Sequence, residues 1–436
     1  MRDVLLTLIF VGIVPFALRH TWIGVLLWTW VSVMNPHKLT YGFANGAPFA
    51  MVAALVTLFS VLINRSKLRL PLDATVVFLI LFLLWMCLTT YNAILPDLSM
   101  EDLVTVLKIQ LMTLVALMSI RERKHIEAFI WVIVLSVGFY GFKGGIFTIT
   151  SGGGARVWGP TGTFIEGNNE VGLALTMIIP LMNYLRVVSP SKWVRRGILL
   201  LMLLSVAAVL GTQSRGALLA IAAMTVVLWL RSRNKALGGV LLVFLSVAFL
   251  AFMPVSWDAR MRTIGNYQDD SSALQRLNAW GMAIRIANDR ITGGGYAVET
   301  RSVVAKYADN PDWVFTAHSI YFQALGEQGW IGLFLFLGIG ATAFWSTVRI
   351  RHASRDRKES LWLFELGGML QVSMVGYAVG GAFLSLTYLD IVYDVAVVIV
   401  AAKLWLRDRR WESEPRGLFN SGEPVGKLKL RAVAHA

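Results

Sequence analysis

The chain has 436 residues, of which 56% are hydrophobic and only 15% are charged, whereas a soluble domain usually carries about 25% charged residues. The apolar residues form long uncharged runs, each able to cross a hydrocarbon layer of about 30 Å as a helix. The formal net charge of +14 sits mainly in short basic clusters between these runs, which argues against nucleic-acid binding. The single cysteine, Cys87, excludes intrachain disulfides and a cysteine metal cluster.

Long apolar runs follow one another along the chain. The first two are short and are separated by Arg19 and His20, so residues 4–35 could make one broken crossing or two. The N-terminal amine and Arg2 favour a cytoplasmic N-terminus and one broken crossing, which gives about twelve crossings, against about thirteen otherwise. The runs lie at 4–18, 21–35, 47–64, 73–94, 103–120, 126–149, 170–187, 197–211, 216–230, 237–254, 328–348, 361–383 and 388–406.

Short basic clusters alternate with weakly charged or acidic connections such as 97–102. Because Lys and Arg are enriched in cytoplasmic loops, the clusters predict the cytoplasmic ends of the helices from residue 47 onward. The connections expected on the outer face are 150–169, 211–216, 255–327 and 384–389. The clusters themselves lie at 65–69, 121–124, 186–196, 231–235, 349–358 and 407–410.

The long outer-face loop has helical spacing of its own. Leu274, Leu277 and Trp280 share one face, which predicts a helix over 271–287 that ends before the glycines at 293–295. The expected fold is therefore an all-α polytopic membrane protein with a helical periplasmic cap. Its expected parts are an N-terminal transmembrane bundle (1–254), a periplasmic helical loop (255–327), C-terminal transmembrane helices (328–410) and a cytoplasmic tail (411–436).

A polar connection between two apolar helices is the first candidate site, because ionisable groups at membrane helix ends are costly. It reads Thr212-Gln213-Ser214-Arg215-Gly216 and lies on the expected outer face. Its backbone N–H groups, the Ser214 hydroxyl and the Arg215 guanidinium suit a phosphate or diphosphate. The competing interpretation is an interfacial arginine that reaches to water, but its outer location runs against the positive-inside trend.

The long outer loop holds a second candidate site. Arg276 and Trp280 lie one helical turn apart and could present a cation and a ring to one ligand, unless the helix simply rests Trp280 at the interface. His318 precedes a polar helix start that contains Gln323, a further candidate for substrate binding. An imidazole there could take a proton from an attacking hydroxyl. No set of residues with metal-ligand spacing accompanies it, so no metal is expected.

The glycine-rich loop 151–170 could contact a glycan. Its glycines permit close backbone approach to a ligand. Arg156 can meet an anion, Trp158 can stack on a sugar face, and Asn168 and Asn169 can bond sugar hydroxyls. The alternative is a loop without a ligand, and a nucleotide-binding loop is rejected because the glycines do not follow a strand.

Together these residues resemble the O-antigen ligase and polymerase superfamily, over almost the whole chain to about residue 406. The region shared by the superfamily is represented by Ser214-Arg215-Gly216-Ala217, Arg276 with Trp280, Gly293-Gly294-Gly295-Tyr296, His318 ahead of Gln323, and Gly326-Glu327-Gln328-Gly329. A ligase branch described as O-glycosylation ligases is similar in Asn35-Pro36-His37-Lys38, Arg156-Val157-Trp158-Gly159-Pro160 and Asn168-Asn169-Glu170.

The resemblance implies a GT-C-like glycosyltransferase of the bacterial inner membrane with its active site facing the periplasm. Such ligases transfer a polysaccharide from undecaprenyl diphosphate to a sugar hydroxyl of lipid A-core in lipopolysaccharide assembly, without a metal or other cofactor. By the same resemblance, Arg215 and Arg276 would hold the diphosphate, His318 would be the general base, and Arg156 would add an anion or glycan contact. Two guanidinium groups can stabilise the leaving diphosphate. An inverting single displacement is expected, because a base on the opposite side of the anomeric carbon gives in-line attack.

Other functions stay open on the sequence alone. A polymerase or a protein O-glycosylation ligase would use the same donor with another acceptor. A transporter of lipid-linked glycans would be expected to show matched, Gly/Pro-broken halves, and no such pairing is visible. A non-catalytic scaffold would tolerate the loss of Arg215.

Overall fold

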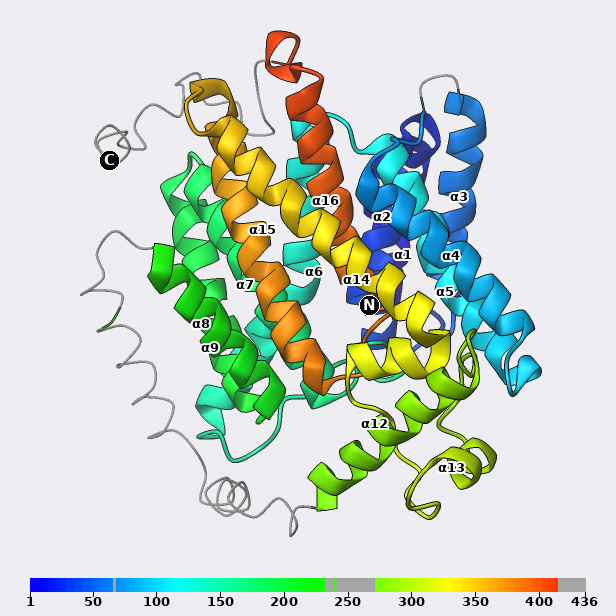
Figure 1. Ribbon diagram of the computed structural model, residues 1–436. Coiled ribbons are helices and arrows are strands. Elements are labelled where there is room, and N and C mark those ends of the chain that lie inside the picture. Colours follow the sequence, from blue (N-terminus) through cyan, green and yellow to red (C-terminus); the bar gives the residue numbers. More distant parts are fainter. Residues whose placement is uncertain (66–67, 232–238, 240–270, 415–436) are drawn as a thin grey trace.

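The computed structural model describes residues 1–65, 68–231, 239 and 271–414, and these form helices and no strand (Figure 1). The run expected at 237–254 (apart from residue 239), the start of the expected cap and the tail beyond 414 lie outside the described residues. The helices are α1 (Arg2–Arg19), α2 (Thr21–Thr29), α3 (Phe49–Asn64), α4 (Ala74–Tyr91), α5 (Pro96–Ser119), α6 (Arg123–Thr150), α7 (Asn168–Val188), α8 (Lys192–Gly211), α9 (Arg215–Arg231), α12 (Ser271–Asp289), α13 (Arg301–Tyr307), α14 (Ile320–Ser354), α15 (Leu361–Gly380) and α16 (Asp390–Arg407).

Seven stretches of helix are long and apolar enough to cross a membrane by length and composition: α4, α5, α6, α7, α8, α14, and α15 with its flanking 3₁₀ turns over Lys358–Phe383. This confirms an all-helical, multi-pass membrane architecture within the described residues. The expected number of about twelve crossings stays a prediction. The short helix α13 was not expected, because seven residues are too few for a periodic pattern to stand out.

The connections expected on the outer face gather at one end of the bundle, together with α12 and α13 (Figure 1). The turn after α4 meets the glycines of the cap, where the Ile94 N–H donates to the Gly294 carbonyl at 2.8 Å. The 151–167 loop meets the end of α8, where the Val157 N–H donates to the Gly211 carbonyl at 3.0 Å. Segments far apart in the chain therefore build one polar end.

The described residues of the basic clusters lie at the other end of the helices. The Arg121 guanidinium donates to the Arg69 carbonyl, and the Arg123 N–H donates to Glu414 Oε2 at 3.2 Å. The alternation expected from charge thus appears in space as two opposite ends. Which end faces which compartment remains a prediction from the positive-inside rule.

The beginning of the chain corrects one expectation. Asp3 near the start of α1 accepts hydrogen bonds from the N–H groups of Gly42 and Ala44, just before α3. Arg19 ends α1 and Asn64 ends α3. The Asn64 side chain donates to the Arg19 carbonyl at 3.3 Å. Hence α1 runs parallel to α3, and α1 and α2 form a hairpin instead of one broken crossing. The N-terminus therefore lies at the end of the bundle opposite the described basic residues, where Asp3 binds the 42–44 turn.

Two glycine-containing motifs pair with each other and attach the cap to α14. The Gly294 N–H donates to the Gly326 carbonyl, and the Gly295 N–H donates to the Glu327 carbonyl, both at 2.9 Å. The helix α14 is broken just beyond, at Gly329, whose φ is +68°. Glycine tolerates this left-handed backbone without the steric cost that a Cβ would bring.

The break in α14 exposes backbone and side-chain groups that are satisfied by the neighbouring helices. The Trp85 Nε1–H donates to the Gln328 carbonyl at 2.8 Å, and the Thr89 hydroxyl donates to Gln328 Oε1 at 2.5 Å. Gln328 Nε2 donates to the Tyr388 hydroxyl at 3.0 Å, which in turn donates to Glu327 Oε2 at 2.6 Å. Gln328 is fully buried, so these bonds replace the water that its amide would otherwise need.

The pairing of the two motifs makes a test of the fold. A Cβ at Gly293, whose φ is +68°, would lie 2.4 Å from the Gly329 nitrogen, whereas a Cβ at Gly152, with φ +59°, would meet nothing within 4 Å. Gly152→Ala should cost only backbone strain, about 1–2 kcal/mol. Gly293→Ala should cost a further 1–3 kcal/mol, roughly, from overpacking. Thermal unfolding of the two purified variants in the same detergent measures the difference. Equal melting temperatures would contradict the close packing.

Candidate active site

The start of α9 is built by its own hydroxyl residues. Thr212 Oγ1 accepts from the Ser214 N–H at 3.3 Å, and Ser214 Oγ accepts from the Ala217 N–H at 3.2 Å. Ser214 is therefore an N-cap residue of the helix, and at 1% exposure its hydroxyl serves the fold. Gln213 takes a left-handed backbone with φ +54°. This turn sets Arg215, the first helical residue, at the polar end of the bundle in a half-buried position.

The glycine-rich loop before α7 packs on the same turn. Arg156 Nε donates to Gln213 Oε1 at 3.3 Å, and Gln213 Nε2 donates to the Gly153 carbonyl at 3.1 Å. Asn168 Nδ2 donates to the Thr212 carbonyl at 2.8 Å, so this amide, expected to bind substrate, also braces the start of α9. Side chains of the loop and of the turn before Arg215 therefore hydrogen-bond the two segments to each other.

Two further loop residues that the sequence nominated differ in their exposure. Trp158 is 58% exposed, which leaves its ring open to a sugar face. Asn169 is half-buried at the start of α7. Of the loop candidates, Trp158 therefore has the surface that a glycan contact requires.

The cap and the start of α14 hold the other group of candidates. Trp280 Nε1 donates to the Ala317 carbonyl at 2.7 Å, and its ring stacks on Phe322 with centroids 4.6 Å apart and an interplanar angle of 9°. On the other side of the same peptide segment, the Ala317 N–H donates to Glu299 Oε1 at 3.3 Å. The backbone immediately before His318 is therefore fixed by two side chains.

His318 has a backbone and an environment that set it apart. Its φ is +43°, a left-handed conformation that costs a non-glycine residue about 1–3 kcal/mol and is often found at functional sites. Burial lowers the pKa of His318, and the positive charge of Arg276 lowers it further. Arg276 is thus near enough to act on the imidazole. A lowered pKa favours the neutral ring, which is the form that can accept a proton.

Gln323 is used differently from its expected role. Its Oε1 accepts from the Thr387 N–H at 3.1 Å, and its Nε2 donates to Glu327 Oε1 at 3.2 Å. The side chain therefore joins α14 to the connection before α16, and it reaches substrate only by giving up these bonds. The sequence could not show this, because the partner lies more than 60 positions away.

Glu299 is the residue that sequence reasoning missed. Burial raises the pKa of this carboxyl, and the charge of Asp102 adds to the effect. Nothing in the local sequence marks it, since it lies in an irregular stretch between α12 and α13. Its contact with Ala317 makes it part of the support of His318. Within the described residues, no group of three His, Cys, Asp or Glu side chains is placed to hold a metal ion.

A short 3₁₀ turn, η6 (Gly381–Phe383), brings the two groups of candidates to the same place. A Cβ at Gly216, beside Arg215, would lie 3.2 Å from Phe383 Cβ, and a Cβ at Gly381 would lie 2.6 Å from Ile320 Cδ1. The starts of α9 and of α14 therefore both pack against this turn. Arg215 and His318 consequently lie at the same polar end of the bundle.

An apolar cavity begins beside His318 and extends between the helices. It holds about 490 Å³ between α14, α15 and α16, and its walls include Ile320, Tyr321, Phe344, Tyr377 and Ile399. Phe344 is itself partly exposed on the side of the bundle. A long hydrocarbon chain is the kind of ligand that such a wall accommodates.

Two family models match the chain and together span most of it. Residues 1–189 match a family of unknown function (DUF5935), and residues 174–337 match the family described as O-antigen ligase. A search of curated proteins found no match. The ligase match contains Arg215, Arg276 and His318, the residues on which the resemblance rested. Residues 174–337 therefore carry a domain of the O-antigen ligase family, which supports the resemblance to the O-antigen ligase superfamily.

Proposed function

We propose that this protein is an O-antigen ligase that transfers a polysaccharide from undecaprenyl diphosphate to a sugar hydroxyl of lipid A-core. The reaction would take place at the periplasmic face of the inner membrane, without a metal, and with inversion at the anomeric carbon. The observation that carries the proposal is a half-buried imidazole, His318, just before a membrane helix, whose pKa is lowered by burial and by the positive charge of Arg276. The match to the O-antigen ligase family supports the same class of reaction.

The leaving group explains why cations are needed. A departing diphosphate gains negative charge, and arginine can meet phosphate oxygens with two parallel N–H donors. Arg215 at the start of α9 also has the backbone N–H groups of a helix N-terminus beside it. Arg215 and Arg276 would stabilise the charge as the sugar–phosphate bond breaks.

The acceptor hydroxyl requires a base. A neutral imidazole accepts its proton, a contribution of about 10²–10⁴-fold in rate. In the balanced step, the acceptor oxygen forms the new glycosidic bond, the bond from the anomeric carbon to the diphosphate oxygen breaks, and His318 takes the acceptor proton. A positive Arg276 nearby disfavours protonation of the free imidazole, so His318 is ready to act as a base at neutral pH.

The donor's lipid fits the cavity beside the site. The 490 Å³ apolar space begins at Ile320 and Tyr321, two residues beyond His318. A prenyl chain in that space would set its diphosphate at the membrane surface near the polar end. The exposed Trp158 ring offers a surface for the sugars that extend beyond the membrane.

A polymerase of the same superfamily is the nearest alternative, since it would use the same donor and base. Deletion of the gene separates the two: core lipid without attached polysaccharide indicates a ligase, whereas single repeats still attached indicate a polymerase. A protein O-glycosylation ligase would instead leave protein side chains unglycosylated. A transporter would keep moving lipid-linked glycan in a His318→Ala variant that forms no bond.

The direct test is transfer in vitro with purified protein, a lipid-diphosphate glycan and a core-lipid acceptor, with a chelator present. His318→Ala should lower kcat by about 10²–10⁴-fold. In the unmodified protein, kcat/KM should fall as pH drops through the lowered pKa of His318, below the ordinary value of about 6.5. Arg276→Gln removes the neighbouring positive charge, so the acid limb of its residual activity should move to higher pH. If the acid limb lay at the same pH in Arg276→Gln and in the unmodified protein, the titrating group would not be His318.

The diphosphate contact of Arg215 can be tested with one variant that removes its charge and one that keeps the charge but changes the donor geometry. Arg215→Gln should reduce kcat by about 10²–10³-fold, the size of effect seen when one transition-state donor is removed. Arg215→Lys keeps the charge but loses the two-pronged geometry, so it should recover only part of the rate. The control is Arg301→Gln, at an exposed cation on α13. Full activity in Arg215→Gln would remove Arg215 from the mechanism.

Trp280 is a positioning residue, because it acts on His318 through Ala317. Trp280→Phe keeps a ring against Phe322 but loses the hydrogen bond to the Ala317 carbonyl. We expect kcat to fall by about 10–10²-fold with little change in KM, since a misplaced base affects the chemical step. Trp330→Phe is the control, because Trp330 Nε1 donates to Asn288 Oδ1 at 3.0 Å between α14 and α12. Equal effects of the two variants would indicate a purely structural role.

A further inference from the structure

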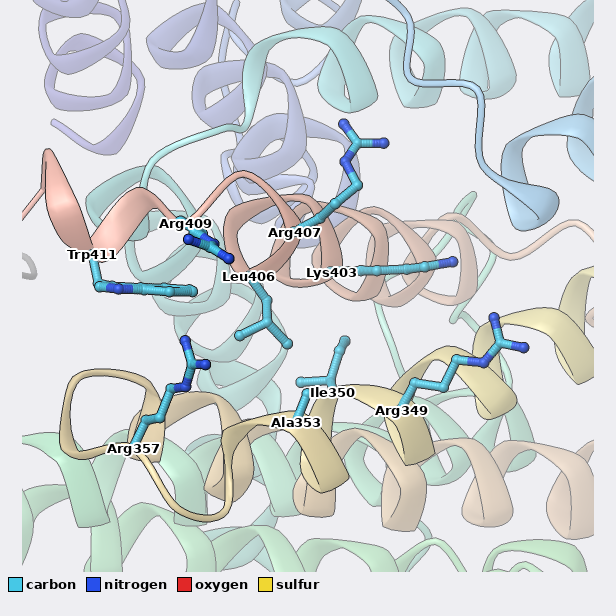
Figure 2. Close-up of a pocket in the computed structure, with 9 residues that line it drawn as sticks. All are labelled: Arg349, Ile350, Ala353, Arg357, Lys403, Leu406, Arg407, Arg409 and Trp411. Atoms are coloured by element: carbon cyan, nitrogen blue, oxygen red, sulfur yellow. The ribbon is translucent and has the colours of Figure 1, made fainter.

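A cavity lies at the end of the bundle opposite the cap, between the last turns of α14 and α16 (Figure 2). It holds about 350 Å³. Its charged side chains come from both helices and from the turns that follow them. The residues that line it are Arg349, Ile350, Ala353, Arg357, Lys403, Leu406, Arg407, Arg409 and Trp411.

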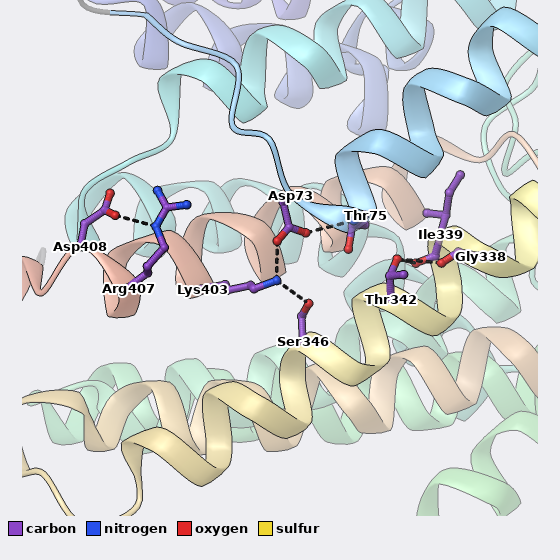
Figure 3. Close-up of polar contacts among 9 residues, drawn as sticks. All are labelled: Asp73, Thr75, Gly338, Ile339, Thr342, Ser346, Lys403, Arg407 and Asp408. Atoms are coloured by element: carbon purple, nitrogen blue, oxygen red, sulfur yellow. Dashed lines mark hydrogen bonds and ion pairs between the residues drawn. The ribbon is translucent and has the colours of Figure 1, made fainter.

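Two of the five cations around this cavity have carboxylate partners. Lys403 pairs with Asp73 at the inner side and also donates to Ser346 Oγ at 3.4 Å, and Arg407 Nε pairs with Asp408 Oδ1 at 2.8 Å (Figure 3). For Arg349, Arg357 and Arg409, the described part of the chain offers no carboxylate within ion-pair distance. The cavity therefore carries a net positive charge.

The outer wall of the cavity is held in place. The Arg357 guanidinium lies over the Trp411 ring, 5.2 Å from its centroid, and the Trp411 and Trp405 rings are 5.9 Å apart. The segment just beyond Trp411 is anchored, because Glu414 Oε2 accepts from Trp405 Nε1 at 3.2 Å. Trp411 is thus a fixed wall and not a loose end.

The positive-inside rule explains why cations occur at this end, but not why they surround one hollow. The guanidinium groups of Arg357 and Arg409 lie on the same side of the cavity (Figure 2), and the repulsion between them is relieved when an anion binds there. The same hollow has an apolar floor of Ile350, Ala353 and Leu406. A ligand that suits both surfaces has an anionic head and an apolar body.

The level of the cavity along the helices matches that of lipid headgroups. Trp345 lies one turn before Arg349, is 57% exposed on the side of α14, and has the Arg349 guanidinium over its ring at 5.9 Å. Tryptophans in this position mark the boundary between hydrocarbon and headgroups. The cavity therefore opens where phosphate groups of the bilayer are found.

We propose that this cavity binds the phosphate headgroup of an anionic membrane lipid. Arg357 and Arg409 would contact the phosphate oxygens, and Arg349 would add positive charge on the other side of the cavity (Figure 2). The apolar floor would contact the glycerol and the first carbons of the acyl chains. Basic pockets between membrane helices are suited to such headgroups. The site is independent of the proposed glycan transfer, because it lies at the far end of the bundle from His318.

The test uses the full-length protein and needs no glycan substrate. The triple variant Arg349→Gln/Arg357→Gln/Arg409→Gln is compared with Lys192→Gln/Arg195→Gln/Arg196→Gln, which removes the same charge from the same end of the bundle, outside the cavity. Native mass spectrometry and a fluorescent-lipid titration in detergent measure the binding of phosphatidylglycerol. Phosphatidylcholine and glycerol 3-phosphate are the comparison ligands.

The expected result is tight binding of phosphatidylglycerol to the unmodified protein and to the control variant, and roughly hundredfold weaker binding to the cavity variant, since each lost cation contributes about one kcal/mol. Phosphatidylcholine should not compete. Equal loss in the control and cavity variants would overturn the proposal, because the attraction would then be general. Displacement of the lipid by millimolar glycerol 3-phosphate would also overturn it, by assigning the cavity to a soluble phosphate. Melting curves of both variants verify that they are folded.

Discussion

The architecture depends on one constraint: a helix broken where it packs against other apolar helices must have its freed backbone groups satisfied within the protein. The break in α14 at Gly329 meets it with the Trp85 indole on the Gln328 carbonyl and with glycine pairing to 293–295. The same contacts attach the cap to the bundle. The contacts around Gly329 thus satisfy the backbone groups freed by the break and also fix the position of the cap.

The position of His318 follows from that attachment. Once the cap is fixed, Trp280 and Glu299 hold the two sides of Ala317, and the following residue has a left-handed backbone. The imidazole is half-buried, and burial and the charge of Arg276 lower its pKa. The proposed transfer from a lipid diphosphate would use this imidazole, an arginine at a helix start and the apolar cavity near them.

The two ends of the bundle treat positive charge in different ways. At the cap end the few arginines lie near groups expected to act on substrate, and one of them lowers the pKa of His318. At the opposite end the cations are numerous and surround a cavity beside the bilayer surface. The first arrangement suits a reaction with a diphosphate, and the second suits steady contact with the anionic membrane.

The sequence by itself determined what depends on neighbours along the chain: the apolar runs, the alternation of basic clusters, and the helix over 271–287, found as Ser271–Asp289. It also nominated Arg215, Arg276 and His318, whose chemistry is unusual for the outer end of membrane helices. Only the tertiary structure decided that α1 and α2 form a hairpin, that Ser214 and Gln323 serve the fold, and that Glu299 supports His318. Each of these depends on hydrogen bonds or packing between residues brought together by folding, or on burial, and local periodicity carries no information about such contacts.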